Sequence, residues 1–371
     1  MSKREEHLNF EEEFFSKDRK AGRRLRKELS AKDRSKYKKT DTEKKEKKVI
    51  ELSEGALRGR VLSILSEGIL VECENDEVFC TLKGALKKER TLKKNLVAVG
   101  DWVHLEKKEA STFVISYIEP RYSILSRADN LRKNREQLIA VNIDQLFIVI
   151  SVIQPILKPS LVDRYIIAAR QGNMEPVIVV NKIDLLKTPP SDLDPVHYHE
   201  QVEVYKEFCE IYKNLDIPVI EVSTITKEGI ETLKSKMHGK ASVFSGQSGV
   251  GKTSLINEVL GTNLKTAKIV ERTQKGSHTT TTAQLLPIDG ESFCIDTPGI
   301  RSFGIWQITQ QDLDHYFEEF LPFKEECKYQ NCQHLQEPDC GVKKAVEEGD
   351  ISFMRYSSYY DLKTRPDETF R

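Results

Sequence analysis

The feature that most constrains this 371-residue chain is a stretch with the spacing G-x-x-x-x-G-K-[ST]. It runs Gly246, Gln247, Ser248, Gly249, Val250, Gly251, Lys252, Thr253 and continues into Ser254. Glycines at these positions let the backbone wrap around phosphate oxygens with successive N–H groups pointing inward. The apolar run ASVFS precedes the loop and the helix-forming run TSLINEVL follows it, which is the context that this motif requires. We therefore predict a nucleotide-binding α/β domain in which Lys252 reaches the β- and γ-phosphates and Thr253 binds Mg²⁺.

A second motif, Asn181-Lys182-Ile183-Asp184, follows the strand-like run EPVIVV and indicates which base is bound. A carboxylate at Asp184 accepts the ring N1–H and the exocyclic amine of guanine, whereas adenine offers neither donor there. The stem of Lys182 is expected to lie across the base, and Asn181 to brace the loop. The motif favours GTP over ATP.

Further candidate residues follow other strand-like runs. In EVST, the backbone N–H groups of Ser223 and Thr224 are expected to reach the guanine O6. In Asp296-Thr297-Pro298-Gly299, Asp296 is expected to hold Mg²⁺ through a water and the Gly299 N–H to contact the γ-phosphate.

The polar segment KGSHTTTT lies between the phosphate loop and Asp296, where a GTPase carries its first switch. One of its threonines is expected to complete the Mg²⁺ shell, and Thr280 is favoured. The alternative interpretation is a polar linker without a metal ligand.

The order of these motifs is unusual, because the base-reading motif comes before the phosphate loop. In a doubly wound, mostly parallel sheet the ligand lies where loops meet at the carboxyl ends of the strands. The geometry of such a site depends on where the loops lie in space and not on their order along the chain. We therefore predict a circularly permuted P-loop α/β GTPase domain over residues 140–305.

The flanking regions predict further domains. Residues 56–120 contain five short strand candidates, which favours an OB-like β-barrel, with an SH3-like barrel as the alternative. The Lys-rich loop 83–96 makes that barrel a candidate RNA-binding platform. Residues 1–50 carry 18 lysines and arginines against 11 acidic residues, whereas the remainder carries 40 against 47. We interpret residues 1–50 as a disordered basic leader, which either reaches a polyanionic partner or is merely solvated.

The seven cysteines divide into two groups. Four are scattered through strand-like or helical segments and fit buried free thiols: Cys73, Cys80, Cys209 and Cys294. The other three cluster with a histidine, as Cys327, Cys332, His334 and Cys340. Three thiolates and one imidazole in 14 residues are typical of structural zinc, since no position is left for a catalytic water. Residues 306–371 are accordingly predicted to form a helical zinc-binding domain, and basic and aromatic residues of its helix-like segment 342–362 are candidate RNA contacts.

Composition limits the setting of the protein. The longest apolar run, LFIVISVI, is far too short to cross a bilayer, and the charged N-terminus lacks the apolar stretch of a secretory signal. We expect a cytoplasmic protein without membrane contact, and nothing in the sequence demands more than a monomer.

The combined motifs resemble the circularly permuted, ribosome small-subunit-dependent GTPases of the RsgA (YjeQ) type over residues 56–362. The resemblance depends on NKID, GQSGVGKTSLIN, GSHTTT, DTPGIRSFG, the cysteine–histidine pattern and KKAVEEGDIS. It implies binding to the 30S subunit and its 16S rRNA, with GTP hydrolysis timing late maturation and release. The family usually has Gly-Arg-His in the first switch, but here Gly276-Ser277-His278 lacks the arginine, so a contact of that side chain is missing.

The residue after Gly299 bears on how fast GTP is hydrolysed. Ile300 follows Gly299 where Ras-like enzymes have a water-orienting glutamine, which predicts slow hydrolysis accelerated by a partner. His278 is a candidate for positioning the water, although a structural or ribosome-contact role fits equally. The main alternative function is an RNA-binding scaffold in which GTP locks a conformation with little hydrolysis. A small-molecule kinase is a weaker alternative, since NKID has no place in it.

Overall fold

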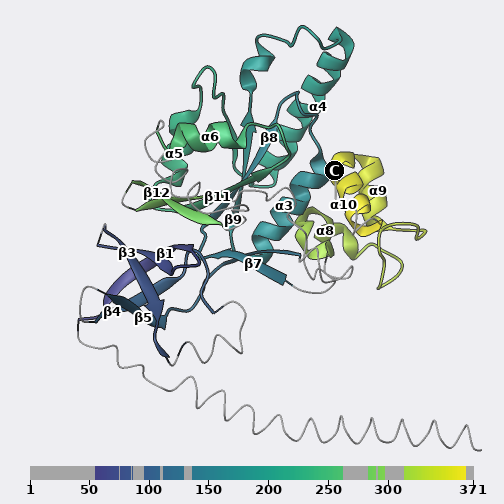
Figure 1. The fold of residues 1–371 in the computed structure, drawn as a ribbon. Helices are drawn as coiled ribbons and strands as arrows, with labels where there is room; N and C mark the ends of the chain where they lie inside the picture. The colour runs from purple at the N-terminus through teal and green to yellow at the C-terminus, as the bar shows by residue number, and fades with distance from the viewer. Residues whose placement is uncertain are drawn as a thin grey trace, which may run out of the picture. The chain divides into compact units, whose positions relative to one another are not determined.

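The structure is a computed structural model that describes residues 55–74, 76–84, 86, 96–108, 112–128, 136–261, 283–289, 291–296 and 313–364 (Figure 1). The basic leader 1–50, most of the Lys-rich loop 83–96 and the segment KGSHTTTT lie outside the described residues.

Alternating apolar residues in the N-terminal region form a closed five-stranded barrel. Its strands are β1 (Leu57–Ile64), β2 (Ile69–Cys73), β3 (Asp76–Leu82), β4 (Trp102–Lys107) and β5 (Phe113–Ile118). Their order is β1-β2-β3-β5-β4; β3 pairs with β5 in parallel, and β1 closes the barrel against β4. Inward-facing Val61, Val71 and Leu105 are fully buried. This non-sequential order is that of a Greek-key OB barrel, as the sequence predicted, and not of a meander.

A two-stranded sheet that the sequence analysis missed follows the barrel. Strands β6 (Ile124–Ala128) and β7 (Glu136–Val141) pair antiparallel. Leu125 and Ala140 are buried in the same core cluster as the neighbouring α/β domain. These two strands therefore pack as part of the core of the α/β domain.

A six-stranded sheet carries the nucleotide motifs, in the order β10-β9-β8-β11-β13-β12. Its strands are β8 (Gln145–Ser151), β9 (Glu175–Asn181), β10 (Val219–Glu221), β11 (Ala241–Gly246), β12 (Gln284–Asp289) and β13 (Ser292–Asp296). All neighbours are parallel except β12 and β13. The predicted doubly wound, mostly parallel sheet is confirmed.

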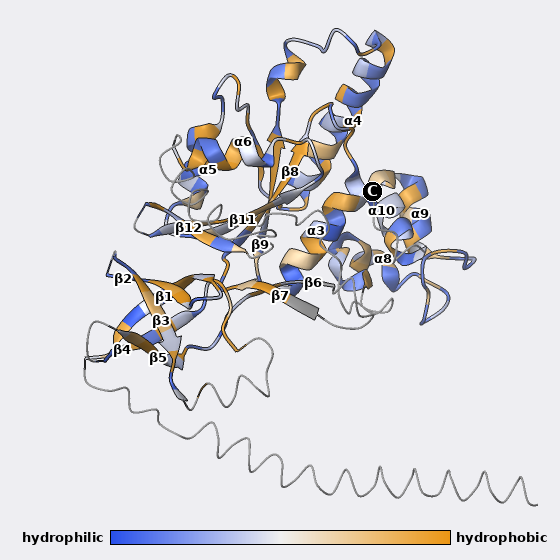
Figure 2. Cartoon of the chain, in the orientation of Figure 1, coloured by the Kyte–Doolittle hydropathy of each residue, from blue (hydrophilic) through white to orange (hydrophobic). Residues whose placement is uncertain are grey.

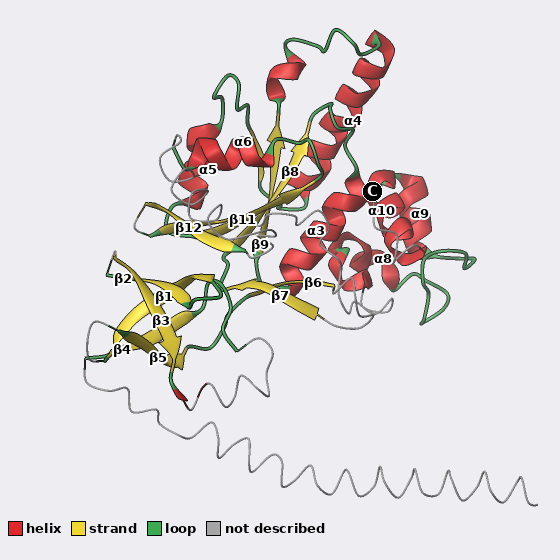
Figure 3. Ribbon diagram, viewed as in Figure 1, coloured by secondary structure: helices red, strands yellow, loops and turns green. Residues whose placement is uncertain are grey.

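Helices cover both faces of this sheet (Figure 3). They are α3 (Pro159–Gln171), α4 (Pro195–Asn214), α5 (Ile230–Met237) and α6 (Lys252–Val259). Within β8, Leu146 and Ile148 belong to the core cluster with α3 and α4, whereas Phe147 and Val149 belong to the cluster with α5 and α6. Every residue of β8 is buried, which explains its continuous apolar sequence, coloured orange in Figure 2.

The C-terminal region consists of short helices around the cysteine–histidine cluster. They are the 3₁₀ helices η3 (Leu313–Tyr316) and η4 (Glu318–Phe320), then α8 (Leu321–Lys324), α9 (Gly341–Glu348) and α10 (Phe353–Thr364). Its core includes Phe317, Phe320 and Tyr359 together with Ile167 of α3. The region therefore packs directly against the nucleotide-binding domain.

Two expectations for the C-terminal segment need correction. Residues 342–362 form two helices, because Gly349 takes the left-handed conformation with φ +87° and ends α9. Two of the residues that were candidates for RNA contact, Arg355 and Tyr359, are buried inside the protein. Their polar groups bind carboxylates there, so they are structural. Among the described helices, none is long and apolar enough to cross a membrane.

Candidate functional site

The phosphate loop connects the end of β11 to the start of α6. Gly246, Gly249 and Gly251 have φ values of +147°, +86° and +92°, which side-chain-bearing residues rarely adopt. A Cβ on Gly246 would lie 2.1 Å from the Val149 carbonyl oxygen of β8. Among the described residues no side chain caps α6, and the N-terminus of a helix is a favourable place for an anion.

The side chain of Lys252 lies inside this loop. Its Nζ donates to the carbonyl oxygens of Gly246 and Gln247, both at 2.7 Å. Thr253 and Ser254 are exposed in the first turn of α6, whereas Val250 is buried against the sheet. The loop thus presents a cation, two hydroxyls and backbone donors at one end of the sheet.

The base-reading motif contacts the phosphate loop. Asn181 ends β9, and its Nδ2 donates to the Val250 carbonyl oxygen at 2.8 Å, across 69 positions of sequence. A Cβ on Gly251 would lie 2.4 Å from the same Nδ2. Motifs that the chain presents in reverse order therefore meet in space and line one site.

The Asp184 carboxylate is held by Ser223, which lies in the loop after β10. The Ser223 hydroxyl donates to Asp184 Oδ1 at 2.6 Å and accepts from the N–H groups of Ile225 and Thr226. The Ser223 N–H donates to the Glu228 carbonyl oxygen at 3.0 Å. In this structure the Ser223 N–H is therefore used by a neighbouring carbonyl and its hydroxyl holds Asp184, while the expected contact of Ser223 and Thr224 with the guanine O6 stays a prediction.

A segment that the sequence analysis missed lies beside both motifs. Lys182 takes a left-handed conformation, and its Nζ donates to the Gln154 carbonyl oxygen at 2.7 Å. Pro155 lies beside the phosphate loop, 3.9 Å from where a Cβ on Gly249 would be. No sequence motif marks this segment, because its contribution at Gln154 is a backbone carbonyl.

The Mg²⁺-side residues are only partly described. Asp296 ends β13, which is parallel to β11 with Val243 opposite Ile295, so Asp296 ends its strand at the same edge as the phosphate loop. Gly299, His278 and Thr280 lie outside the described residues.

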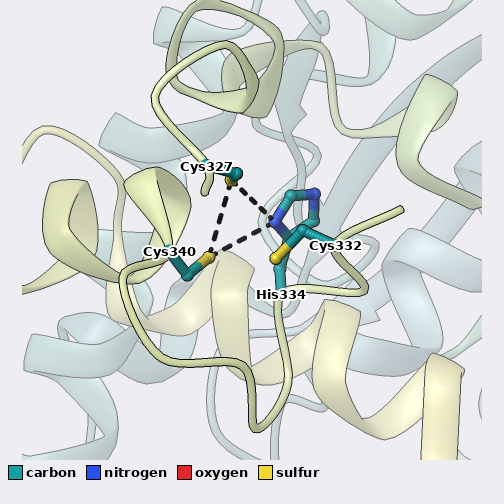
Figure 4. Close-up of side chains that lie close together, drawn as sticks. All are labelled: Cys327, Cys332, His334 and Cys340. Atoms are coloured by element: carbon teal, nitrogen blue, oxygen red, sulfur yellow. Dashed lines mark hydrogen bonds between the residues drawn. The ribbon is translucent and has the colours of Figure 1, made fainter. Parts of the chain in front are cut away.

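The second cluster brings together the side chains of Cys327, Cys332, His334 and Cys340 (Figure 4), whose ligand atoms all lie within 4.8 Å of one another. The Sγ atoms of Cys327 and Cys340 are 3.9 Å apart and lie 3.6 and 3.4 Å from His334 Nδ1. A tetrahedral ion with Zn–S near 2.3 Å and Zn–N near 2.1 Å would give roughly 3.8 Å between sulfurs and roughly 3.6 Å between sulfur and nitrogen. The four residues therefore fit a metal ion of this kind.

The environment of this cluster favours neutral imidazole and charge-compensated thiolates. Burial lowers the pKa of His334 below its ordinary value, which keeps the ring in the form that binds metals. Burial also raises the pKa of Cys332 to about 12, so a thiolate there needs a nearby cation. Glu337 folds the loop by accepting the N–H groups of Gln333, Leu335 and Gln336 at 2.8, 3.0 and 3.1 Å. Glu337 was not singled out from the sequence, because a backbone-capping carboxylate has no distinctive spacing.

The comparisons with known proteins agree with this architecture. The family model for the RsgA GTPase matches residues 118–306, and this range includes the base-reading motif and the phosphate loop. The chain belongs to the RsgA GTPase family. It is therefore a GTP-hydrolysing enzyme, and the resemblance inferred from its motifs is confirmed.

Relatives within this family extend over most of the chain. The small ribosomal subunit biogenesis GTPase RsgA of Bacteroides fragilis strain YCH46 is 36% identical over 82% of this chain and 96% of its own length. The protein of the same name from Chlorobaculum parvum is 41% identical over 74% of this chain and 86% of its own length.

Two solved structures share the fold. YjeQ from Thermotoga maritima is 32% identical, with a TM-score of 0.64 over 83% of this chain and 97% of that chain. YloQ, described as a circularly permuted GTPase, is 24% identical with a TM-score of 0.63 and covers 85% of this chain and 96% of its own, which supports the fold alone. The predicted circular permutation is confirmed.

Proposed function

We propose that this enzyme binds the small (30S) ribosomal subunit through its 16S rRNA and hydrolyses GTP to time late maturation of the subunit and its own release. The observation that carries the proposal is the contact of Asn181 with the Val250 carbonyl, which joins the base-reading motif to the phosphate loop. The names of the RsgA relatives, small ribosomal subunit biogenesis GTPases, supply the ribosomal partner. We place this activity in the cytoplasm, with the chain acting as a monomer.

The phosphate end of the site would act through a small set of groups. Lys252 leaves its loop carbonyls for the β- and γ-phosphates, which offer a stronger, negatively charged acceptor. Thr253 would hold Mg²⁺ directly and Asp296 through a water, with Thr280 as a further ligand, and the N–H of Gly299 would contact the γ-phosphate. A bound Mg²⁺ would supply positive charge next to the phosphoryl oxygens.

The base end would select guanine. Asp184, fixed by the Ser223 hydroxyl, accepts two hydrogen bonds from the base, and the N–H of Thr224 donates to O6. Lys182 is held across the site by the Gln154 carbonyl, and Ile183, which is buried, anchors the motif. The cost of leaving Asp184 unpaired opposite adenine excludes ATP.

The Cys327, Cys332, His334 and Cys340 cluster would hold one structural Zn²⁺. Four protein ligands at tetrahedral spacing leave no open position, so the ion would stabilise the C-terminal region and take no part in hydrolysis.

The proposed timing depends on slow hydrolysis by the free enzyme. Ile300 cannot orient water by hydrogen bonding, and His278 is the candidate that does so when the subunit is bound. We expect single-turnover phosphate release to be slow for the free enzyme and accelerated by purified 30S subunits, but not by 50S subunits. Co-sedimentation should show stronger 30S binding with a GTP analogue than with GDP.

A Lys252→Ala variant provides the control, because it should lose hydrolysis whether or not subunits are present. A hydrolysis rate that 30S subunits leave unchanged would contradict the proposed timing. If co-sedimentation persisted in that case, the chain would bind the subunit as a scaffold.

A further inference from the structure

The imidazole of His334 has two differently placed nitrogens. Its Nδ1 lies 3.4 Å from Cys340 Sγ and 3.6 Å from Cys327 Sγ, so this is the nitrogen that faces the proposed metal. A neutral imidazole that binds through Nδ1 must carry its proton on Nε2. That Nε2 is fully buried and has no hydrogen-bond partner among the described residues, and the residue itself is only 1% exposed.

The group that faces His334 Nε2 is the carboxylate of Asp314 in η3. Its Oδ2 lies 3.8 Å from Nε2, and Asp314 is itself buried. Asp314 is held from other sides: its Oδ1 lies 2.7 Å from the Tyr359 hydroxyl and 3.1 Å from Lys363 Nζ, and its Oδ2 lies 3.2 Å from Lys324 Nζ. The carboxylate is therefore held by side chains of α8 and α10, and the Tyr359 hydroxyl, 2.9 Å from the Gln333 carbonyl oxygen, links it to the metal loop.

The charges of this cluster balance when a divalent ion is included. Three thiolates, a neutral imidazole and a divalent cation carry one net negative charge, and Asp314 adds a second. Lys324 and Lys363 supply two positive charges, and the Lys363 side chain is only 2% exposed. A buried ammonium is costly unless it is paired, so the buried Lys363 indicates that the region folds around excess negative charge, and the partly exposed Lys324 adds a second positive charge.

We propose that Asp314, together with Lys324 and Lys363, forms an outer shell that orients His334 toward the metal ion. The Asp314 carboxylate attracts the Nε2–H and so keeps Nδ1 directed at the thiolates, while the two ammonium groups neutralise the anionic cluster. Carboxylates behind a ligating histidine fix its tautomer and orientation and strengthen metal binding. This inference rests on the proposed metal site but goes beyond its four ligands.

Zinc affinity of the full-length chain tests the proposal, measured by competition with a chromophoric chelator at neutral pH. We expect Asp314→Asn to weaken zinc binding by about 10- to 100-fold. The matched control is Asp163→Asn, because Asp163 is an equally buried carboxylate that contacts Arg355 and Tyr212 and no metal ligand. This control should lower resistance to unfolding but leave zinc affinity within about twofold, as expected for a site without shared partners.

The possible outcomes distinguish failure of the metal site from failure of the outer-shell role of Asp314. If the wild-type chain binds no zinc, the proposed metal site fails. If it binds zinc but Asp314→Asn binds equally well, or Asp163→Asn is weakened as much, the outer-shell role fails alone.

A second measurement needs no variant and covers the case in which Asp314→Asn does not fold. In the zinc-loaded wild-type protein with ¹⁵N-labelled histidine, the His334 resonances should show a metal-bound Nδ1 and a protonated, slowly exchanging Nε2. A metal-bound Nε2 would overturn the assignment.

Discussion

The Ser223 hydroxyl holds the carboxylate of Asp184, which we propose to recognise the base. Ser223 donates to Asp184 and is in turn oriented by two backbone N–H groups, so the carboxylate is preorganised before a base arrives. Preorganisation of this kind lowers the ordering cost of binding.

We therefore expect Ser223→Ala to weaken GDP binding by roughly tenfold, since the loss of one hydrogen bond to a charged group costs about 1.5 kcal/mol. The ratio of GDP affinity to ADP affinity should also fall, as measured by calorimetric titration of both nucleotides. Ser235→Ala is the control, because the Ser235 hydroxyl only donates to a carbonyl oxygen on the exposed side of α5. Unchanged affinity in Ser223→Ala would show that Asp184 needs no such support.

A pH-dependent interaction at the residue scale lies in the barrel. The paired hydrogen bonds from Arg58, against a smaller opposing effect of burial, hold the pKa of Glu119 below its ordinary value. A carboxyl with a lowered folded-state pKa stabilises the protein above its unfolded pKa, and this stabilisation is lost as pH falls through the folded value.

Between pH 5 and pH 3 we expect the barrel of the wild type to lose more stability than that of Glu119→Gln. Urea unfolding followed by Trp102 fluorescence in a Trp306→Phe background measures the difference, because Arg58 lies over the Trp102 ring. Parallel pH profiles for the two proteins would refute the assignment.

The residues that sequence reasoning identified are those whose spacing itself encodes chemistry. The phosphate loop, NKID and the four metal ligands need particular residue types within a few positions, so a single sequence suffices to propose them. Gln154, Asp314 and the Ser223 hydroxyl act through contacts with distant segments, and Gln154 contributes only its backbone. No local pattern reports such pairings.

Among the secondary-structure elements, two glycines show how the same backbone conformation serves different ends. Gly349 ends α9 at φ +87° with nothing within 4 Å of an added Cβ, whereas Gly251 combines φ +92° with an Asn181 atom at 2.4 Å. Position 349 therefore requires glycine only for its backbone conformation. Position 251 requires it also because a Cβ would clash with Asn181.

Gly349→Ala should therefore lower the free energy of unfolding by about 1 kcal/mol and leave GDP affinity unchanged. Gly251→Ala should separate the phosphate loop from NKID and weaken GDP binding at least 100-fold, because it adds a clash to the strained backbone. Thermal unfolding and a fluorescent-GDP titration distinguish the two effects. Equal GDP affinity in Gly349→Ala and Gly251→Ala would contradict the proposal that the phosphate loop and NKID form one site.

The pattern of apolar residues predicted most strands of the barrel and the sheet, because each of these strands buries one or both of its faces. The pair β6 and β7 was missed because it lies between the two predicted domains 56–120 and 140–305, where no element was assigned. The break at Gly349 was missed because apolar periodicity continues across it into α10.

At the scale of the whole molecule, buried charges join the C-terminal region to the nucleotide-binding domain. Arg355 of α10 pairs with Asp163 of α3 and with Glu319, and Tyr212 of α4 donates to the same Asp163. The side chains of Asp163 and Arg355 are 1% and 5% exposed. Removing one partner of a buried pair leaves an uncompensated charge.

Arg355→Met should therefore lower the free energy of unfolding by about 3–5 kcal/mol at neutral pH, as measured by urea denaturation. The double variant Asp163→Asn/Arg355→Met should recover part of this loss, because it no longer buries an unpaired carboxylate. Lys344→Met is the control, because within the described part of the chain Lys344 pairs only with exposed Glu348 on α9, and its loss should change the free energy of unfolding by less than about 1 kcal/mol. A loss of less than about 1 kcal/mol in Arg355→Met would show that the Arg355–Asp163 pair contributes little to stability.

Differences in composition along the chain predicted three domains. The positions of NKID and the phosphate loop predicted the permuted order of the motifs. The sequence did not indicate that the C-terminal region packs on α3. That packing depends on residues such as Asp163 and Arg355, which lie 192 positions apart and resemble ordinary surface charges in sequence.

The permuted order also determines when each part of the enzyme exists during synthesis. Strand β8 is made early but lies beside β11, which follows about 100 residues later, so one edge of β8 stays unpaired while the helices between them are translated. The loops that we propose to read guanine are made before the phosphate loop. With the site built as proposed, a newly made chain cannot bind GTP until residues 181–253 have all emerged, so the early strands of the sheet would assemble before the nucleotide binds.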